Sequence, residues 1–318
     1  MAADTRTRTA ASSRGLFDRL RASPFLSNLL SNRLAVAGLG IIFAMVVVAL
    51  YARLFVAGPF GAPLSDLTSS QLGNAQNKAP PGWLAGQGLL TDIFGTDAQA
   101  RDIYERTLYG AWLALKWGTV TVGLSTVLGV GLGTLAAYYG DVTDNVIMRT
   151  MDVLLAFPSL LLALALVAIF GASLGNAVIA LVLVYTPRFA RVVRGAALKV
   201  LEDEYVDATV ALGASDPRVL VKHVLPNSLA PITVQSTLNF GLAIIDLAAL
   251  SFLGFGAAPG TPSWGIMLSE GVNNGLLTGQ WWLSFFPGLF LAVTVLGFNL
   301  LGDGMRDALD PRMRETVD

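Results

Sequence analysis

The stretch WGTVTVGLSTVLGVGLGTLAAYYG, Trp117 to Gly140, contains no charged residue and decides the fold class. A run of roughly 20 apolar residues, rising about 1.5 Å per residue, crosses a hydrocarbon core about 30 Å thick. A second uncharged run extends from Val153 to Pro187. Only 14% of the 318 residues are charged and 54% are hydrophobic, whereas about 25% of a soluble domain is charged. The sequence therefore predicts an integral membrane protein.

The composition also excludes several classes of function. The chain has no cysteine and a single histidine, His223, so it cannot form disulfides, thiolate zinc sites, iron–sulfur clusters or histidine-rich metal sites. It contains no GxxxxGK[ST] motif, so it does not bind ATP through a P-loop of its own. Its net charge of −1 gives no basic footprint for nucleic acid. We expect no catalytic, cofactor or metal site, and no enzyme activity.

Hydropathy and turn residues predict an all-α polytopic protein with six transmembrane helices. The expected spans are residues 34–56, 111–139, 146–170, 177–189, 229–253 and 283–301. Residues 1–33 are expected as a cytoplasmic arm, and the Pro-, Gly- and Asn-rich residues 57–110 as an extracytoplasmic loop. Residues 111–305 then form a five-helix core with a cytoplasmic loop at 195–228, and residues 306–318 form a cytoplasmic tail. Pro259 and Pro262 interrupt the stretch before the last span, which is expected as a loop that dips partly into the membrane.

The distribution of lysine and arginine sets the expected orientation. With both termini in the cytoplasm, most of the 21 basic residues lie inside, and only Arg53, Lys78, Arg101 and Arg106 lie on the opposite side. Membrane proteins carry an excess of Lys and Arg in their cytoplasmic loops. We therefore expect cytoplasmic N- and C-termini.

Two motifs within the spans predict local geometry. Gly129 and Gly133 form a GxxxG pattern in the second span, which is typical of close packing between helices in lipid. Pro158 lies in the third span and is either a hinge or a kink, tolerated where neighbouring groups satisfy the freed carbonyl.

The cytoplasmic loop between the fourth and fifth spans reads LKVLEDEYVDATVALGASDPRVLVKHVLPNSLAPI, residues 198–232. Three acidic residues suit a helix N-terminus, and Gly213 suits the position after the helix. Pro217 fits the first turn of a second helix, which Pro226 is expected to end at Leu225. This helix–glycine–helix segment is either an ordinary solvated loop or a docking element whose small residues allow another protein to approach closely. Periodicity alone does not decide between the two.

The same loop resembles the "EAA–G–LP" signature of permease subunits in binding-protein-dependent ABC importers. Asp207-Ala208-Thr209 matches the first part, Gly213 the glycine and Leu225-Pro226 the end, with Asp for Glu and Thr for the second Ala. Further segments similar to the same subfamily are FGTDAQARDIYERTLYGA (94–111), MDVLLAFPSLLLALALVAIFGASLGN (151–176), SFLGFGAAPGTPSWGIML (251–268) and FNLLGDGMRDALDPR (298–312). The chain thus resembles the C-type permease subunit of a dipeptide, oligopeptide or nickel importer. Residues 244–256 are most similar to the dipeptide member.

The resemblance implies the type I ABC importer permease fold in a bacterial cytoplasmic (inner) membrane. It also implies a complex with a homologous second permease, two cytoplasmic ATPase subunits that bind ATP and Mg²⁺, and an extracytoplasmic solute-binding protein. The cargo would be dipeptides or short peptides, with oligopeptides, glutathione, haem and nickel chelates as alternatives. The loop residues that would couple to an ATPase are Tyr205, Asp207, Ala208, Thr209, Gly213, Ala214, Leu225 and Pro226.

Three residues are candidates for the translocation path or its gate: Asp246, Asp152 and Asn239. Asp246 lies roughly 25 Å from the cytoplasmic end of its span by helix rise, and an intramembrane carboxylate of this kind is a functional candidate. It would meet a cationic peptide terminus or a metal, or it is an acid near the outer interface, hydrated or paired with the partner subunit. Asp152 is expected to pair with Arg149, three residues earlier, with a gating role as the alternative.

Two other classes of function are alternatives to an ATP-driven importer. A secondary transporter would show paired inverted repeats or broken helices around a midplane ion site, and the sequence shows no such internal repeat. A membrane enzyme would need a catalytic set at one depth, and the single histidine is expected on the cytoplasmic side.

Overall fold

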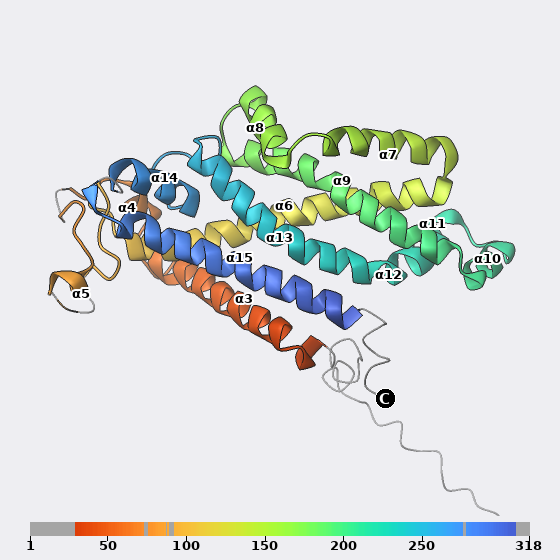
Figure 1. Ribbon diagram of the computed structural model, residues 1–318, viewed down its shortest axis with the longest axis horizontal. Helices are drawn as coiled ribbons and strands as arrows, with labels where there is room; N and C mark the ends of the chain where they lie inside the picture. The colour runs from red at the N-terminus through yellow and green to blue at the C-terminus, as the bar shows by residue number, and fades with distance from the viewer. Residues whose placement is uncertain (1–28, 73–75, 87, 89–91, 276–277, 310–318) are drawn as a thin grey trace, which may run out of the picture.

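The computed structural model describes residues 29–72, 76–86, 88, 92–275 and 278–309. Within these ranges the secondary structure is helical apart from two isolated bridges, Ala57–Ala62 and Thr96–Asp102. Residues 1–28 of the predicted arm and 310–318 of the predicted tail lie outside the described residues. The helices form an elongated bundle whose two ends carry different loops (Figure 1).

Among the described residues, five helices are long and apolar enough to cross a membrane. They are α3 (Arg33–Tyr51, continued by the π-helical η1, Ala52–Val56), α6 (Ile103–Tyr139), α9 (Leu174–Leu201), α13 (Leu229–Phe252) and α15 (Trp282–Leu309). A bent pair, α7 (Asp141–Leu155) and α8 (Ser159–Phe170), covers the third expected span, residues 146–170. The prediction of an all-α polytopic membrane protein is confirmed.

The third span is broken rather than continuous. The axes of α7 and α8 differ by 93°, and Pro158 occupies the break with φ −56° and ψ 129°. A proline disfavours the α conformation of the residue before it, which here is Phe157. The structure therefore shows a sharp corner between two helices at Pro158 rather than a kink within one helix, and the role of Pro158 as a hinge stays a prediction.

Three spans are longer than predicted. The helix α15 continues to Leu309, past the predicted end at residue 301 and into the first residues of the predicted tail. The helix α6 begins at Ile103 rather than residue 111, because the Asp102 carboxylate accepts hydrogen bonds from the backbone N–H groups of Tyr104 (2.7 Å) and Glu105 (3.4 Å). The helix α9 continues to Leu201, past the predicted end at residue 189 and with Pro187 inside it. The spans are predicted from apolar runs, which end at the first charged residues. A helix can continue beyond the lipid into water where its charged side chains find partners.

The segment before the last span is also more ordered than the expected loop. It contains α14 (Trp264–Asn274), whose first turn is capped by the Ser263 hydroxyl, which accepts a hydrogen bond from the N–H of Ile266 at 3.4 Å. The indole N–H of Trp264 donates to the carbonyl of Thr107 at 2.9 Å. This bond fixes α14 to the N-terminal end of α6.

The shorter helices lie at the two ends of the bundle (Figure 1). At one end are α4 (Leu64–Thr68) and α5 (Gly82–Ala85), and at the other α10 (Glu204–Ala211), α11 (Asp216–Val219), η2 (Leu220–Val224) and α12 (Leu225–Asn227). The prediction that Pro226 ends a helix at Leu225 is wrong. The π-helical η2 precedes it, so Pro226 falls in the first turn of α12, where no backbone N–H donor is needed.

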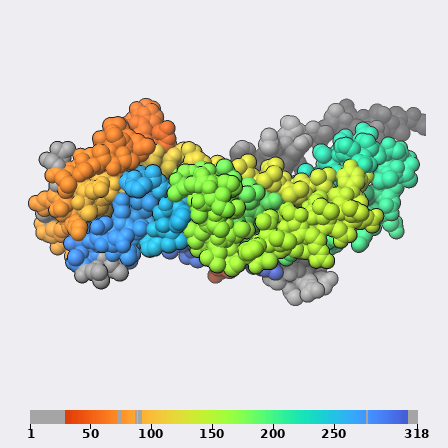
Figure 2. Space-filling model, turned by 90° about the horizontal axis from the view of Figure 1, so that it is seen from above, coloured from red at the N-terminus to blue at the C-terminus, as the bar shows by residue number. Residues whose placement is uncertain are grey.

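Glycines set the closest approaches between the long helices. A Cβ atom on Gly129 would lie 2.3 Å from the Cβ of Phe189, and one on Gly133 would lie 2.4 Å from the carbonyl oxygen of Ala190. The GxxxG prediction of close helix packing is therefore confirmed for the pair α6 and α9. On another side of the bundle α3 packs against α15, with Gly38 against the backbone of Leu301. Figure 2 shows α7 and α8 over the middle of the molecule, between the α14 end and the α10 end.

Candidate functional site

The helix α10 projects from the end of the bundle and is anchored by one side chain. Val206 is 2% exposed and packs with Ala197, Val200, Val219 and Val224. The other residues of α10 leave an apolar surface open, since Val210 is 48% exposed and Leu212, which follows the helix, is 89% exposed. The turn after α10 requires glycine, because Gly213 has φ +82°. An apolar surface of this kind on a short helix is typical of a protein–protein contact.

The predicted coupling residues all lie on the unit formed by α10, α11, η2 and α12, which we call the α10–α12 unit. Asp207, Ala208, Gly213 and Pro226 are exposed, while Thr209, Ala214 and Leu225 are half-buried. The Tyr205 hydroxyl accepts a hydrogen bond from the Asn227 side-chain amide at 2.9 Å, which joins the start of α10 to the end of α12. The two halves of the motif are therefore neighbours in space.

Asp216 fixes the unit to the transmembrane bundle, a role that the sequence did not reveal. Its carboxylate accepts a hydrogen bond from the hydroxyl of Tyr138 at 2.9 Å and from that of Tyr139 at 3.5 Å. Both tyrosines lie in the last turn of α6. These two hydrogen bonds therefore join the start of α11 to the last turn of α6.

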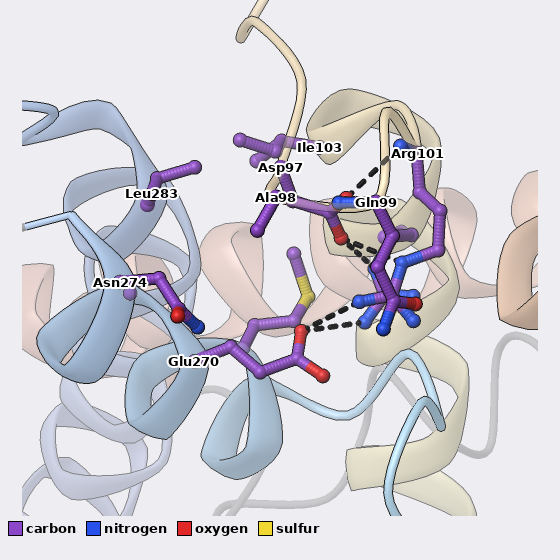
Figure 3. Close-up of a pocket in the computed structure, with 11 residues that line it drawn as sticks. Asp97, Ala98, Gln99, Arg101, Ile103, Glu270, Asn274 and Leu283 are labelled. Carbon is purple, nitrogen blue, oxygen red and sulfur yellow. Dashed lines mark hydrogen bonds and ion pairs between the residues drawn. The ribbon is translucent and has the colours of Figure 1, made fainter. Parts of the chain in front are cut away.

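The opposite end of the bundle holds a cluster of four charged residues (Figure 3). Arg101 is 2% exposed and donates to Asp97 at 2.6 Å and to Glu270 at 2.8 Å. Arg106 is 1% exposed, lies 3.3 Å from Glu270 and 3.8 Å from Asp97, and donates to the carbonyl oxygen of Leu67 at 2.6 Å. We call these four residues the outer charge cluster, after the side on which the orientation expected from the sequence places them. It joins the loop before α6 to α14.

A small cavity of about 120 Å³ lies beside the outer charge cluster. Its polar lining includes Gln99 and Asn274, and Figure 3 shows Glu270 between Asn274 and the arginines. Every guanidinium nitrogen that faces a carboxylate there is already paired, so the cluster is built to fasten elements together rather than to hold a charged ligand. Asp102, at the start of α6, lies near the same end of the bundle. Burial raises the pKa of its carboxyl, partly opposed by the hydrogen bonds from the N–H groups of Tyr104 and Glu105.

The three candidate path residues lie in different surroundings. Asp246 accepts a hydrogen bond from the Tyr185 hydroxyl at 2.7 Å, so its carboxylate is within reach of α9. Asn239 is fully buried, and its Oδ1 accepts from Gln235 at 3.1 Å. Its Nδ2 has no hydrogen-bond partner among the described residues.

Asp152 does not form the predicted ion pair with Arg149. Its carboxylate accepts from the Arg191 guanidinium at 2.7 Å, across the interface between α7 and α9. The long α9 helix, which continues past the predicted span, brings Arg191 into range and so provides a partner from another helix.

Comparisons with known proteins identify the architecture. Residues 129–315 match the family described as "Binding-protein-dependent transport system inner membrane component". The chain belongs to this family. It is 44% identical to the dipeptide transport system permease protein DppC of Escherichia coli, over 89% of this chain and 91% of that protein. It is 42% identical to the DppC protein of Alkalihalophilus pseudofirmus, over 89% of this chain and 87% of that protein.

A third relative is the di/tripeptide transport system permease protein DppC of Pseudomonas aeruginosa, 44% identical over 75% of this chain and 78% of that protein. The solved structure of the MetNI methionine ABC transporter in inward-facing conformations is similar, with a TM-score of 0.52 and 18% identity. The similarity covers 65% of this chain and 98% of that chain. The permease therefore has the type I ABC importer permease fold.

Family membership also decides between the transport classes. The permease is a multi-pass membrane subunit of an ABC transporter that works with a binding protein and an ATPase, so the secondary transporter is not supported. The matched region includes the projecting α10–α12 unit and the outer helix α14.

Proposed function

We propose that this permease is one of two homologous permease subunits of an importer that moves dipeptides or short peptides across the bacterial cytoplasmic membrane. The substrate class is supported by the names of its relatives, which are dipeptide and di/tripeptide permeases. Two cytoplasmic ATPase subunits bind ATP and Mg²⁺, and an extracytoplasmic solute-binding protein delivers the peptide. Oligopeptides, glutathione, haem and nickel chelates are the alternative cargoes within the family.

Both termini and the α10–α12 unit lie on the cytoplasmic side in this proposal. The Lys and Arg bias of the sequence supports it, because Arg191, Arg194, Lys199, Arg218 and Lys222 gather near that end of the bundle. The outer charge cluster and α14 then face the solute-binding protein.

The α10 helix and the turn at Gly213 couple the permease to an ATPase. The observation that supports this most directly is the exposed apolar surface formed by Val210 of α10 and Leu212 just after it, on a helix that is held by one buried residue. Closure of the ATPases on ATP moves α10, and the hydrogen bonds of Asp216 pass that movement to α6. ATP shifts the permease between inward- and outward-facing states only as far as it binds one state more tightly.

Uptake by the purified complex tests the function. The permease, its partner permease, both ATPases and the solute-binding protein are reconstituted in liposomes, and uptake of a labelled dipeptide is measured with and without ATP. We expect uptake that requires ATP and the solute-binding protein, and weaker uptake of glutathione or a nickel chelate. Uptake driven by an ion gradient without ATP would contradict the proposal.

Site-directed cross-linking tests the coupling surface separately. The chain has no native cysteine, so single cysteines can be introduced at chosen positions. Leu212→Cys is expected to cross-link to an ATPase subunit. Leu84→Cys, at the other end of the bundle and 52% exposed, is the control and should give no such product. Equal labelling of ATPase from both positions would show that α10 is not the docking element.

A further inference from the structure

The α9–α13 face of the permease carries two residues of opposite charge that form no direct ion pair. Asp246 on α13 and Arg188 on α9 form no ion pair within the described part of the chain. Tyr185 lies between them: its hydroxyl donates to Asp246 at 2.7 Å, and the guanidinium carbon of Arg188 lies 5.3 Å from the centre of its ring. One buried tyrosine therefore holds an acid at its hydroxyl and a base over its face.

Both charges lie at membrane depth. By helix rise, Asp246 is about 9 Å from the outer end of α13 and Arg188 is about 21 Å from the outer end of α9. Charged side chains at this depth are costly unless they pair or face a water-filled cavity. Because neither Asp246 nor Arg188 has a direct ion pair among the described residues, we infer that the face that carries them is not a lipid face.

The same face continues into a groove at the cytoplasmic half. The groove has a volume of about 620 Å³, and its lining includes Gln235 and Leu238 of α13 and Val192 of α9. Gln235, Leu238, Leu242 and Asp246 follow one another at helical spacing, so they lie along one face of α13. Val192 follows Arg188 by one turn of α9. In Figure 1, α9 and α13 lie side by side and α13 crosses in front of α6.

We infer that Asp246 and Arg188 bind the two charged termini of a peptide in transit. The carboxylate of Asp246 receives the peptide ammonium, and the guanidinium of Arg188 receives the peptide carboxylate. This inference rests on the proposed function and deepens it, because it assigns the residues that recognise a zwitterion on the path.

The size of the pair suits a short peptide. An extended residue spans at most about 3.6 Å, so the termini of a dipeptide are separated by roughly 7 Å. One tyrosine side chain separates the acid from the base: its hydroxyl donates to Asp246 at 2.7 Å, and its ring centre lies 5.3 Å from the guanidinium carbon of Arg188. Tyr185 is fully buried and sets this spacing.

Transport by the complete reconstituted complex tests the inference. Asp246→Asn and Arg188→Gln each remove one charge while the solute-binding protein and the ATPases stay unchanged. Each lost charge-assisted hydrogen bond is expected to lower the initial rate of labelled dialanine uptake by about tenfold or more. ATP hydrolysis stimulated by the solute-binding protein is expected to stay near wild type, so that uptake per ATP falls. Asp303→Asn neutralises an exposed carboxylate on α15 and is the matched control, with unchanged uptake.

A charge exchange separates the peptide from a protein counter-ion. A zwitterion can bind in either direction, so Asp246→Arg combined with Arg188→Asp is expected to restore part of the uptake lost in the single variants. If the charges instead pair with residues of the partner permease, the single variants would reduce co-purification of the two permeases, and the exchange would not restore it. That result overturns the inference. Unchanged dialanine uptake in both single variants also overturns it. If the double variant does not assemble, the single variants alone decide the question.

The proposed function fails in a different way. If the wild-type complex takes up no dipeptide with ATP and its solute-binding protein, the proposed function is wrong. If wild type takes up dialanine and both single variants do so equally well, only the assignment of Asp246 and Arg188 is wrong.

Discussion

Replacing Arg101 with glutamine is expected to loosen the whole outer end of the permease. Its guanidinium is 2% exposed and donates to Asp97 at 2.6 Å, to Glu270 at 2.8 Å and to the carbonyl oxygen of Thr68 at 3.4 Å. Removing one partner of a buried ion pair costs about 3–5 kcal/mol. Glu270 is 30% exposed and Arg106 stays near both acids, so the lower end, about 3 kcal/mol, applies. This corresponds to roughly a hundredfold change in a local opening equilibrium.

Amide hydrogen exchange in the purified complex measures that opening. The N–H of Lys78 donates to the carbonyl of Asp97 at 2.8 Å, and the N–H of Thr96 donates to that of Ala79 at 3.0 Å. In Arg101→Gln these amides are expected to exchange roughly a hundredfold faster. Arg191→Gln is the matched control, because its pair with Asp152 is 56% and 44% exposed and is worth less than about 1 kcal/mol.

Charge balance provides a second check. Arg101→Gln leaves one arginine with two acids, so adding Glu270→Gln returns the outer charge cluster to one positive and one negative residue. We expect the double variant to exchange more slowly than Arg101→Gln alone. Additive effects of the two substitutions would contradict this role of Arg101. Equally faster amide exchange at Lys78 and Thr96 in Arg101→Gln and Arg191→Gln would contradict it too.

Four further predictions follow from single positions. Gly213→Val places a β-branched residue at φ +82°, costs about 1–2 kcal/mol and is expected to lower uptake per ATP hydrolysed, whereas retained coupling would contradict the role of the turn. Gly129→Leu overpacks the α6–α9 contact and is expected to reduce the yield of folded permease by size-exclusion chromatography, whereas Gly131→Leu, with open space around it, should not. Trp264→Phe loses the bond to Thr107, worth about 1 kcal/mol, and should lower the unfolding temperature slightly. Burial raises the pKa of Asp102, so its contribution to stability is present at low pH and is lost as the pH rises through that pKa; Asp102→Asn should reduce this dependence in thermal unfolding.

The sequence predicted those features that depend on neighbouring residues in the chain. Uncharged runs predicted the spans, the GxxxG spacing predicted the close contact of α6 with α9, and Gly213 was expected after a helix and has φ +82°. Each of these follows from residues within a few turns of each other. The roles of Asp246, Asn239 and Asp152 in transport stay predictions.

The features that the sequence did not predict depend on contacts between distant residues. Glu270 meets Arg101 across 169 positions and Arg106 across 164 positions, so no local pattern shows that the two arginines are buried. For the same reason Asp152 pairs with Arg191, 39 positions away, instead of with Arg149. From the sequence alone, a charged side chain in a loop is expected to be exposed to solvent. It is buried only where folding brings an oppositely charged partner from a distant part of the chain.

The two ends of the permease differ in what a rearrangement would cost. At the outer end, two fully buried arginines hold α14 to the loop before α6, and separating buried ion pairs costs several kcal/mol. At the other end, the Arg191–Asp152 pair is largely exposed, and the hydrogen bonds of Asp216 to α6 are exposed too. Exposed pairs exchange with water at a cost of about 1 kcal/mol or less. If α10 contacts the ATPase as proposed, a change of conformation driven by ATP costs least at that end, and the outer charge cluster is expected to keep the opposite end together as one unit.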